Sequence, residues 1–99
     1  MQFTHEDIIR ATGAAARGGA AAVSAVVTHS TRVRDDELFV ALKGARHDGH
    51  RFVGDAVMHG AAAVLLSTDT ECGVPRYIVS DTLVAYQQLA AAHRARFAT

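Results

Sequence analysis

The feature that most constrains the fold is an uninterrupted apolar run, Leu-Phe-Val-Ala-Leu, at residues 38–42. A run of this length and composition is typical of a buried β-strand. The run breaks at Gly44, and the polar loop that follows is closed by Asp48-Gly49. Because strand ends in α/β proteins place ligand-binding loops, residues 38–50 predict a buried strand that delivers a binding loop to the surface.

The segments on either side predict alternating strands and helices. Strands are expected at residues 23–28, 62–67 and 77–79. Helices are expected at residues 6–12, capped by Thr4 and Asp7, at 51–59, and from Thr82 to about Phe97, capped by Asp81. Residues 14–22 form either a flexible loop or a short hairpin. The fold class is therefore α/β, a small three-layer sandwich with a mixed sheet.

On the long helix, one face is expected to point to the core. Its members recur at helical spacing: Leu83, Tyr86, Leu89, Ala90, His93 and Phe97.

Length and charge limit the classes of protein to which the chain can belong. The 99 residues predict one domain, and ten basic residues balance ten acidic ones, which makes binding to nucleic acid unfavourable. No apolar stretch is long enough for a membrane span, and the first residues lack the pattern of a signal peptide. The one cysteine, Cys72, agrees with a reducing compartment. These features favour a cytoplasmic location.

Two kinds of catalytic or metal site were weighed against simpler interpretations. Six histidines, with His47 and His50 on one loop, could suggest a metal site, but their spacing favours ordinary polar loop side chains. A hydrolase arrangement of Ser30, His29 and Asp48 is also disfavoured, since Ser30 lacks the G-x-S-x-G elbow. No catalytic and no metal-binding residue is therefore predicted.

The charged loop residues have two interpretations of equal weight on spacing alone. Lys43, Arg46 and Asp48 could form a solvated turn, with Asp48-Gly49 present for its backbone geometry. They could equally form part of a binding loop.

A set of short motifs in fixed order carries a resemblance to a known family. They are His29-Ser30-Thr31, residues 38–44, Asp48-Gly49-His50-x-Phe52-Val53, Ala56, and Gly-Ala-Ala-Ala-Val at 60–64. Together they resemble the N-terminal domain of the Mur ligases, the ATP-dependent enzymes that build the peptide stem of peptidoglycan. The resemblance runs from about Val23 to Phe97. It is strongest to the members that add D-alanyl-D-alanine to the UDP-N-acetylmuramoyl tripeptide, with those that add the third stem residue as the alternative.

The resemblance implies a non-catalytic domain, residues 1–99, that binds the UDP end of a UDP-N-acetylmuramoyl-peptide. The matching site positions are Thr28, Ser30, Gly44, Ala45, Arg46, His47, Asp48 and Gly49. A uracil edge presents two carbonyl acceptors and one N–H, which a hydroxyl and backbone groups can pair. His29 and Thr31 stand where the family usually has an acid and an arginine, and Asp35-Asp36 replaces its usual Pro-Gly.

The family's catalytic step needs ATP and Mg²⁺, which the resemblance assigns to a central domain. The sequence holds no G-x-x-x-x-G-K-[ST] phosphate loop, so we expect that domain and its cofactors to lie outside these residues. The partners implied are the UDP-N-acetylmuramoyl-peptide and the rest of the same chain, with a role in cell wall biogenesis, cell shape and cell division. A stand-alone small-ligand or interaction module that reuses the fold is the alternative from another class.

Overall fold

The computed structural model describes residues 2–96, which form one mixed sheet with helices on both faces. The strands are β1 (Ala15–Arg17), β2 (Ala25–Val27), β3 (Glu37–Val40), β4 (Ala63–Leu66) and β5 (Arg76–Ile78). The helices are α1 (His5–Thr12), α2 (Val53–Met58) and α3 (Thr82–Ala95), and short 3₁₀-helices cover Ser30–Arg32 and Gly49–Phe52.

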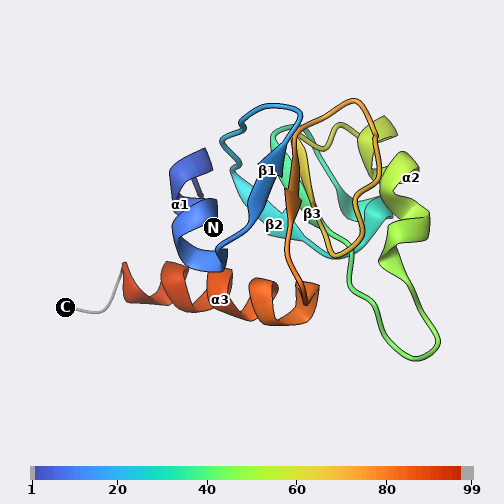
Figure 1. The fold of residues 1–99 in the computed structure, drawn as a ribbon. Coiled ribbons are helices and arrows are strands. Elements are labelled where there is room, and N and C mark those ends of the chain that lie inside the picture. The colour runs from blue at the N-terminus through green and yellow to red at the C-terminus, as the bar shows by residue number, and fades with distance from the viewer. Residues whose placement is uncertain (1, 97–99) are drawn as a thin grey trace.

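The sheet has the order β1-β5-β4-β3-β2. Strands β2 to β5 are parallel, and β1 is antiparallel to β5 at one edge. Helices α1 and α3 lie against one face, and α2 lies on the other (Figure 1). The predicted three-layer sandwich with a mixed sheet is confirmed.

The apolar run at residues 38–42 is continuous because β3 is buried on both faces. Leu38 and Val40 join the core under α1 and α3, whereas Phe39 and Ala41 join the core under α2. This is the behaviour of a central parallel strand, whose alternate side chains both meet a helical layer.

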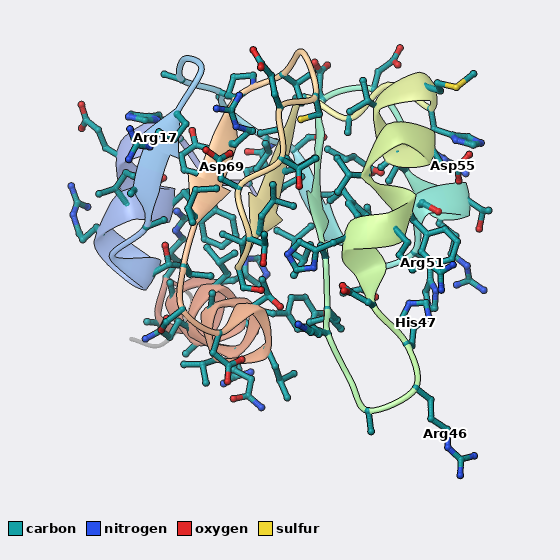
Figure 2. The ribbon with its side chains drawn as sticks, turned by 45° about the vertical axis from the view of Figure 1, so that its right-hand side comes forward. Arg17, Arg46, His47, Arg51, Asp55 and Asp69 are labelled. Carbon is teal, nitrogen blue, oxygen red and sulfur yellow. The ribbon has the colours of Figure 1, made fainter. Side chains whose placement is uncertain are left out.

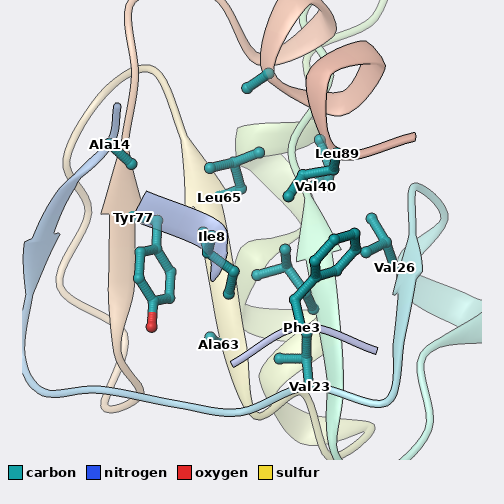
Figure 3. Close-up of a cluster of buried hydrophobic side chains, with 12 residues drawn as sticks. Phe3, Ile8, Ala14, Val23, Val26, Val40, Ala63, Leu65, Tyr77 and Leu89 are labelled. Carbon is teal, nitrogen blue, oxygen red and sulfur yellow. The ribbon is translucent and has the colours of Figure 1, made fainter. Parts of the chain in front are cut away.

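The larger core lies between the sheet and the pair α1 and α3 (Figure 3). Phe3, Ile8 and Leu89 are completely or almost completely buried there. Tyr77 is also buried, and its hydroxyl lies 2.7 Å from His5 Nδ1 and accepts from the Ala21 N–H at 3.1 Å. Burial raises the pKa of this phenol.

The predicted helix caps are confirmed in detail. Thr4 and Asp7 form a capping box, in which the Thr4 hydroxyl accepts from the Asp7 N–H and the Asp7 carboxylate accepts from the Thr4 N–H. Gly13 ends α1 in the left-handed conformation, φ 69°. The Asp81 carboxylate accepts from the N–H groups of Leu83 and Val84 at the start of α3.

The apolar face expected on α3 is confirmed in part. Leu89 is buried and Tyr86 packs against the core, whereas Leu83 is 50% exposed and Thr82 and Ala85 are buried in addition. Phe97 lies outside the described residues.

Residues 14–22 are neither a flexible loop nor a hairpin. They contain β1, which pairs with the distant β5. All three side chains of β1 are exposed, so an open sheet edge, and no local apolar pattern, decides its conformation. No helix among residues 2–96 is long and apolar enough to cross a membrane.

Candidate functional site

A pocket of about 190 Å³ lies at the sheet edge where β2 and β3 end. Because the two strands are parallel and adjacent, their carboxyl ends bring two loops together. The lining comes from residues after β2, from β3 and from the loop between β3 and α2: Thr28, His29, Ser30, Thr31, Phe39, His47, Gly49 and Phe52. Four of the eight predicted site residues, Thr28, Ser30, His47 and Gly49, are among them.

The loop between β3 and α2 is fixed at its base and extended at its tip. Lys43 and Asp48 pair as an isolated antiparallel bridge, and the Gly44 N–H donates to the His47 carbonyl at 2.7 Å. Ala45 and Arg46 therefore occupy the tip. The Arg46 side chain points away from the rest of the molecule (Figure 2). Neither of these two predicted site residues lines the pocket.

Gly49 closes the floor of the pocket against the end of β3. Its N–H donates to the Leu42 carbonyl at 2.7 Å. A Cβ at this position would lie 2.9 Å from both Ala41 Cα and the Leu42 nitrogen. Glycine is required here because of this close approach of two backbone segments.

Ser30 presents its hydroxyl to the pocket. The residue is only 7% exposed and begins the 3₁₀-helix that follows β2. No hydrogen-bond partner for its side chain exists among the residues that the structure describes. The hydroxyl is therefore available to form a hydrogen bond with a ligand atom in the pocket.

An aromatic pair forms one wall of the pocket. The rings of His47 and Phe52 are stacked, with centroids 5.4 Å apart and an interplanar angle of 15°. Phe52 is 41% exposed although it is a large apolar residue. Phe52 falls within the helix that is expected at residues 51–59. Its place in a 3₁₀-helix just before α2 turns the ring to the pocket.

Asp48 shapes the loop and does not line the pocket. Its carboxylate accepts from the His50 N–H at 3.0 Å and lies 2.7 Å from His50 Nδ1. First the backbone N–H and then the imidazole of His50 hold the pKa of the Asp48 carboxyl below its ordinary value. This contact takes Asp48 away from His29 and Ser30, with which it would have to form a hydrolase triad.

The segments that form the pocket carry exposed arginines. Arg32, Arg46 and Arg51 form no ion pair with any described residue, and Arg32 is the one that lines the adjoining hollow. Beside the pocket lies a polar hollow of about 540 Å³, which shares Thr31 with it and includes Arg32 and Arg34. The positive potential of these arginines attracts anions.

Other features of residues 2–96 make weaker sites. A hollow of about 450 Å³ near the start of the chain contains Asp7 and Arg96, but these two pair with each other at 2.9 Å. Within the described part of the chain, no three His, Cys, Asp or Glu side chains are grouped so that they could hold a metal ion.

The chain is similar in sequence to known peptidoglycan precursor ligases. Residues 22–94 match the family described as "Mur ligase family, catalytic domain". The UDP-N-acetylmuramoyl-tripeptide–D-alanyl-D-alanine ligase of Escherichia coli is 40% identical over 75 residues, which is 76% of this chain and 17% of that protein. The UDP-N-acetylmuramoyl-L-alanyl-D-glutamate–2,6-diaminopimelate ligase of Aquifex aeolicus is 40% identical over 60 residues, which is 61% of this chain and 12% of that protein.

The solved structures agree with the sequence comparisons. A structure of MurF from Acinetobacter baumannii matches with a TM-score of 0.88 and 25% identity, over 97% of this chain and 22% of that chain. MurF ligase from Thermotoga maritima, in complex with ADP, matches with a TM-score of 0.62 and 32% identity, over 69% of this chain and 16% of that chain. The chain thus spans less than a quarter of the length of each of these relatives.

Proposed function

The chain belongs to the Mur ligase family, and we propose that it binds the uridine end of a UDP-N-acetylmuramoyl-peptide in the pocket at the ends of β2 and β3. The observation that carries this proposal is the combination, in one pocket, of the Ser30 hydroxyl without a partner and the stacked rings of His47 and Phe52. A flat aromatic surface suits the face of a pyrimidine, and the hydroxyl suits its polar edge.

The size of the pocket supports binding of one part of the substrate. A pocket for a whole drug-sized ligand has about 300 to 1,000 Å³, whereas this one has about 190 Å³. It therefore holds the base and leaves the diphosphate at the rim. There Arg32 and the adjoining basic hollow supply unpaired positive charge.

In the proposed enzyme, this domain binds the substrate and another part of the chain carries out the reaction. We propose that the complete ligase adds D-alanyl-D-alanine and uses ATP and Mg²⁺ held by another part of the chain. Binding energy from the distant uridine then orients the reacting carboxylate. No catalytic residue is assigned to residues 1–99. As in the family at large, we expect the enzyme to act in the cytoplasm.

One specific observation supports a second candidate reaction, the addition of diaminopimelate. Ligases that add diaminopimelate, such as that of Aquifex aeolicus, are as similar in identity as those that add D-alanyl-D-alanine. Among the solved structures, a D-alanyl-D-alanyl ligase from Acinetobacter baumannii matches 97% of this chain with a TM-score of 0.88. We therefore prefer D-alanyl-D-alanine addition.

A titration with UDP, followed by NMR of the ¹⁵N-labelled chain, tests the binding site. We expect affinity in the range of about 10 µM to 1 mM, because an open pocket that binds one part of a ligand provides only about 4 to 7 kcal/mol. The largest shifts should fall at Ser30, His47 and Gly49. Shifts confined to Asp7 and Arg96, or none at saturating UDP in a folded chain, would contradict the assignment.

A further inference from the structure

His50 connects the loop that carries the pocket to a strand that does not line it. Its Nδ1 lies 2.7 Å from Asp48 Oδ1, and its Nε2 accepts from the backbone N–H groups of Ser67 at 2.9 Å and Thr68 at 3.3 Å. The Ser67 hydroxyl also lies 3.3 Å from Nε2. The His50 side chain is only 10% exposed.

These contacts determine where the imidazole carries its proton. A backbone N–H can only donate, so Nε2 must present a lone pair to Ser67 and Thr68. The proton of the neutral ring then sits on Nδ1 and is donated to the Asp48 carboxylate. The close contact between Asp48 and His50 is therefore a hydrogen bond from a neutral ring.

We propose that His50 is a positioning residue that acts only as the neutral Nδ1–H imidazole, and that it holds the floor of the pocket against the end of β4. We call the contacts of His50 with Asp48, Ser67 and Thr68 the clamp. The expected effect on ligand affinity depends on the proposed function, whereas the clamp itself does not. Gly49, which lines the pocket, directly precedes His50, and His47 lies three residues before it. Release of His50 from Ser67 therefore removes one of the contacts that hold these lining residues, whereas the backbone hydrogen bonds of Gly49 with Leu42 and of His47 with Gly44 remain.

Protonation is the event that releases the clamp. When Nε2 binds a proton, it can no longer accept a hydrogen bond. Its N–H then faces the N–H groups of Ser67 and Thr68, and both hydrogen bonds are lost. The charged groups around the ring are Asp48 and Lys43 on the same loop, Arg51 next in sequence, and Asp81, which shares a small pocket with Lys43 and Ser67. Asp48 attracts the imidazolium charge, but it cannot restore the lost acceptor. The Asp81 carboxylate is engaged at the start of α3.

Two substitutions distinguish the effect of the hydrogen-bond acceptor at position 50 from the effect of its protonation. His50→Gln retains an oxygen that can accept from Ser67 but carries no group that titrates near neutral pH. His50→Ala removes the acceptor at every pH. His59→Gln is the matched control, because His59 is half-exposed at the C-terminal end of α2 and its side chain contacts Asp55 of that helix.

The test is amide hydrogen exchange at Ser67 and Thr68 of the chain between about pH 8 and pH 5, the range in which histidines titrate, combined with the imidazole ¹⁵N shifts of His50. We expect the Nδ1–H tautomer at the upper end of this range. After correction for intrinsic exchange, protection of Ser67 should fall about five- to tenfold on protonation, the effect of one lost hydrogen bond. His50→Gln should keep its protection across the range, His50→Ala should lose it throughout, and His59→Gln should follow the wild type.

The proposal and the function on which it partly depends fail in different ways. An Nε2–H tautomer, or unchanged Ser67 protection on protonation and in His50→Gln alike, would overturn the clamp; the wild-type titration decides this even when His50→Ala does not fold. If the clamp behaves as expected, UDP affinity should weaken on acidification in the wild type and not in His50→Gln. A clamp that releases while the chain binds no UDP at any pH would instead overturn the proposed function.

Discussion

The two faces of the sheet divide stability and binding between them. Among residues 2–96, twelve buried residues form the core under α1 and α3, whereas eight form the core under α2. Helix α3 has 14 residues and α2 has only six, so α2 leaves the ends of β2 and β3 uncovered. The uncovered end is the candidate site, and Phe39 belongs both to the smaller core and to the wall of the pocket. The larger core on one face can thus supply most of the stability, while the other face keeps an open pocket in which the Ser30 hydroxyl has no partner within the described part of the chain.

The largest effect on stability should come from the face under α1 and α3. Leu89→Ala removes a completely buried side chain from the centre of α3, and we expect a loss of about 2 to 5 kcal/mol in the free energy of unfolding. Chemical denaturation measures this loss. The UDP shift pattern of the folded fraction should be unchanged, and a loss below about 1 kcal/mol would show that this core is not the main source of stability.

Gly49→Ala should affect both the stability and the site. The new Cβ would lie 2.9 Å from backbone atoms of Ala41 and Leu42, so the loop must move. We expect about 1 to 3 kcal/mol of destabilisation, by overpacking, and loss of UDP binding. Gly54→Ala is the matched control, since its Cβ would meet nothing within 4 Å. Its helical position predicts a small gain in stability. Equal behaviour of the two variants in thermal unfolding and titration would be evidence against the close approach.

Ser30→Ala should change binding and leave stability nearly unchanged. Removal of the hydroxyl leaves an acceptor of the uracil unpaired, which should cost about 1 to 3 kcal/mol, a decrease in UDP affinity of about 5- to 150-fold. Calorimetry at two salt concentrations checks this, and the loss should not depend on salt. Ser80→Ala, at an exposed serine outside the pocket, should bind as the wild type does. Equal titration curves for Ser30→Ala and wild type would show that this serine does not contact the base.

Arg46→Ala should have a smaller effect of electrostatic origin. Its side chain points away from the pocket (Figure 2), so we expect a loss in UDP affinity of at most about 0.5 kcal/mol, which added salt should abolish. Arg17→Ala, on the exposed edge strand β1, is the control for a change in net charge alone. A salt-independent loss of more than about tenfold would mean that the loop tip folds over the ligand.

The smallest effect concerns the start of α1 in acid. The Thr4 N–H is the main cause that holds the pKa of the Asp7 carboxyl below its ordinary 3.8. The stabilising contribution of this carboxylate is therefore complete above pH 3.8 and is lost as the pH falls through the lowered value of the folded state. Asp7→Asn should flatten the acid end of the stability curve. Glu6→Gln, in the same turn but outside the capping box, should not.

The sequence predicted those parts of the fold that local residues decide. The caps at Thr4 and Asp81 depend on neighbours within four residues, and both were predicted correctly. The β1 strand was missed because its partner β5 lies about 60 residues away and its own side chains carry no pattern. On α3, Leu89 and Tyr86 were assigned correctly to the core, but Leu83 was not: Leu83 and Ala85 are both apolar, and only tertiary packing decides which of them is buried.

The candidate site also contains residues that were predicted and one that was not. The resemblance indicated Ser30, His47 and Gly49, which line the pocket, but also Arg46, whose charge made it conspicuous although it lies at the loop tip. Phe52 was not predicted as a site residue, because it falls within the helix expected at residues 51–59. The signal that could have identified it is its position one residue before the helix proper, where the phase of the helix does not yet apply.

The most direct test of the uridine pocket is the measurement of intermolecular NOEs between bound UDP and the chain. The uracil H5 and H6 protons should show NOEs to the ring protons of Phe52 and His47, because these rings form the wall on which the base would stack. Uracil NOEs to side chains of another region, such as those around Asp7 and Arg96, would contradict the account, as would NOEs from the ribose alone with none from the base.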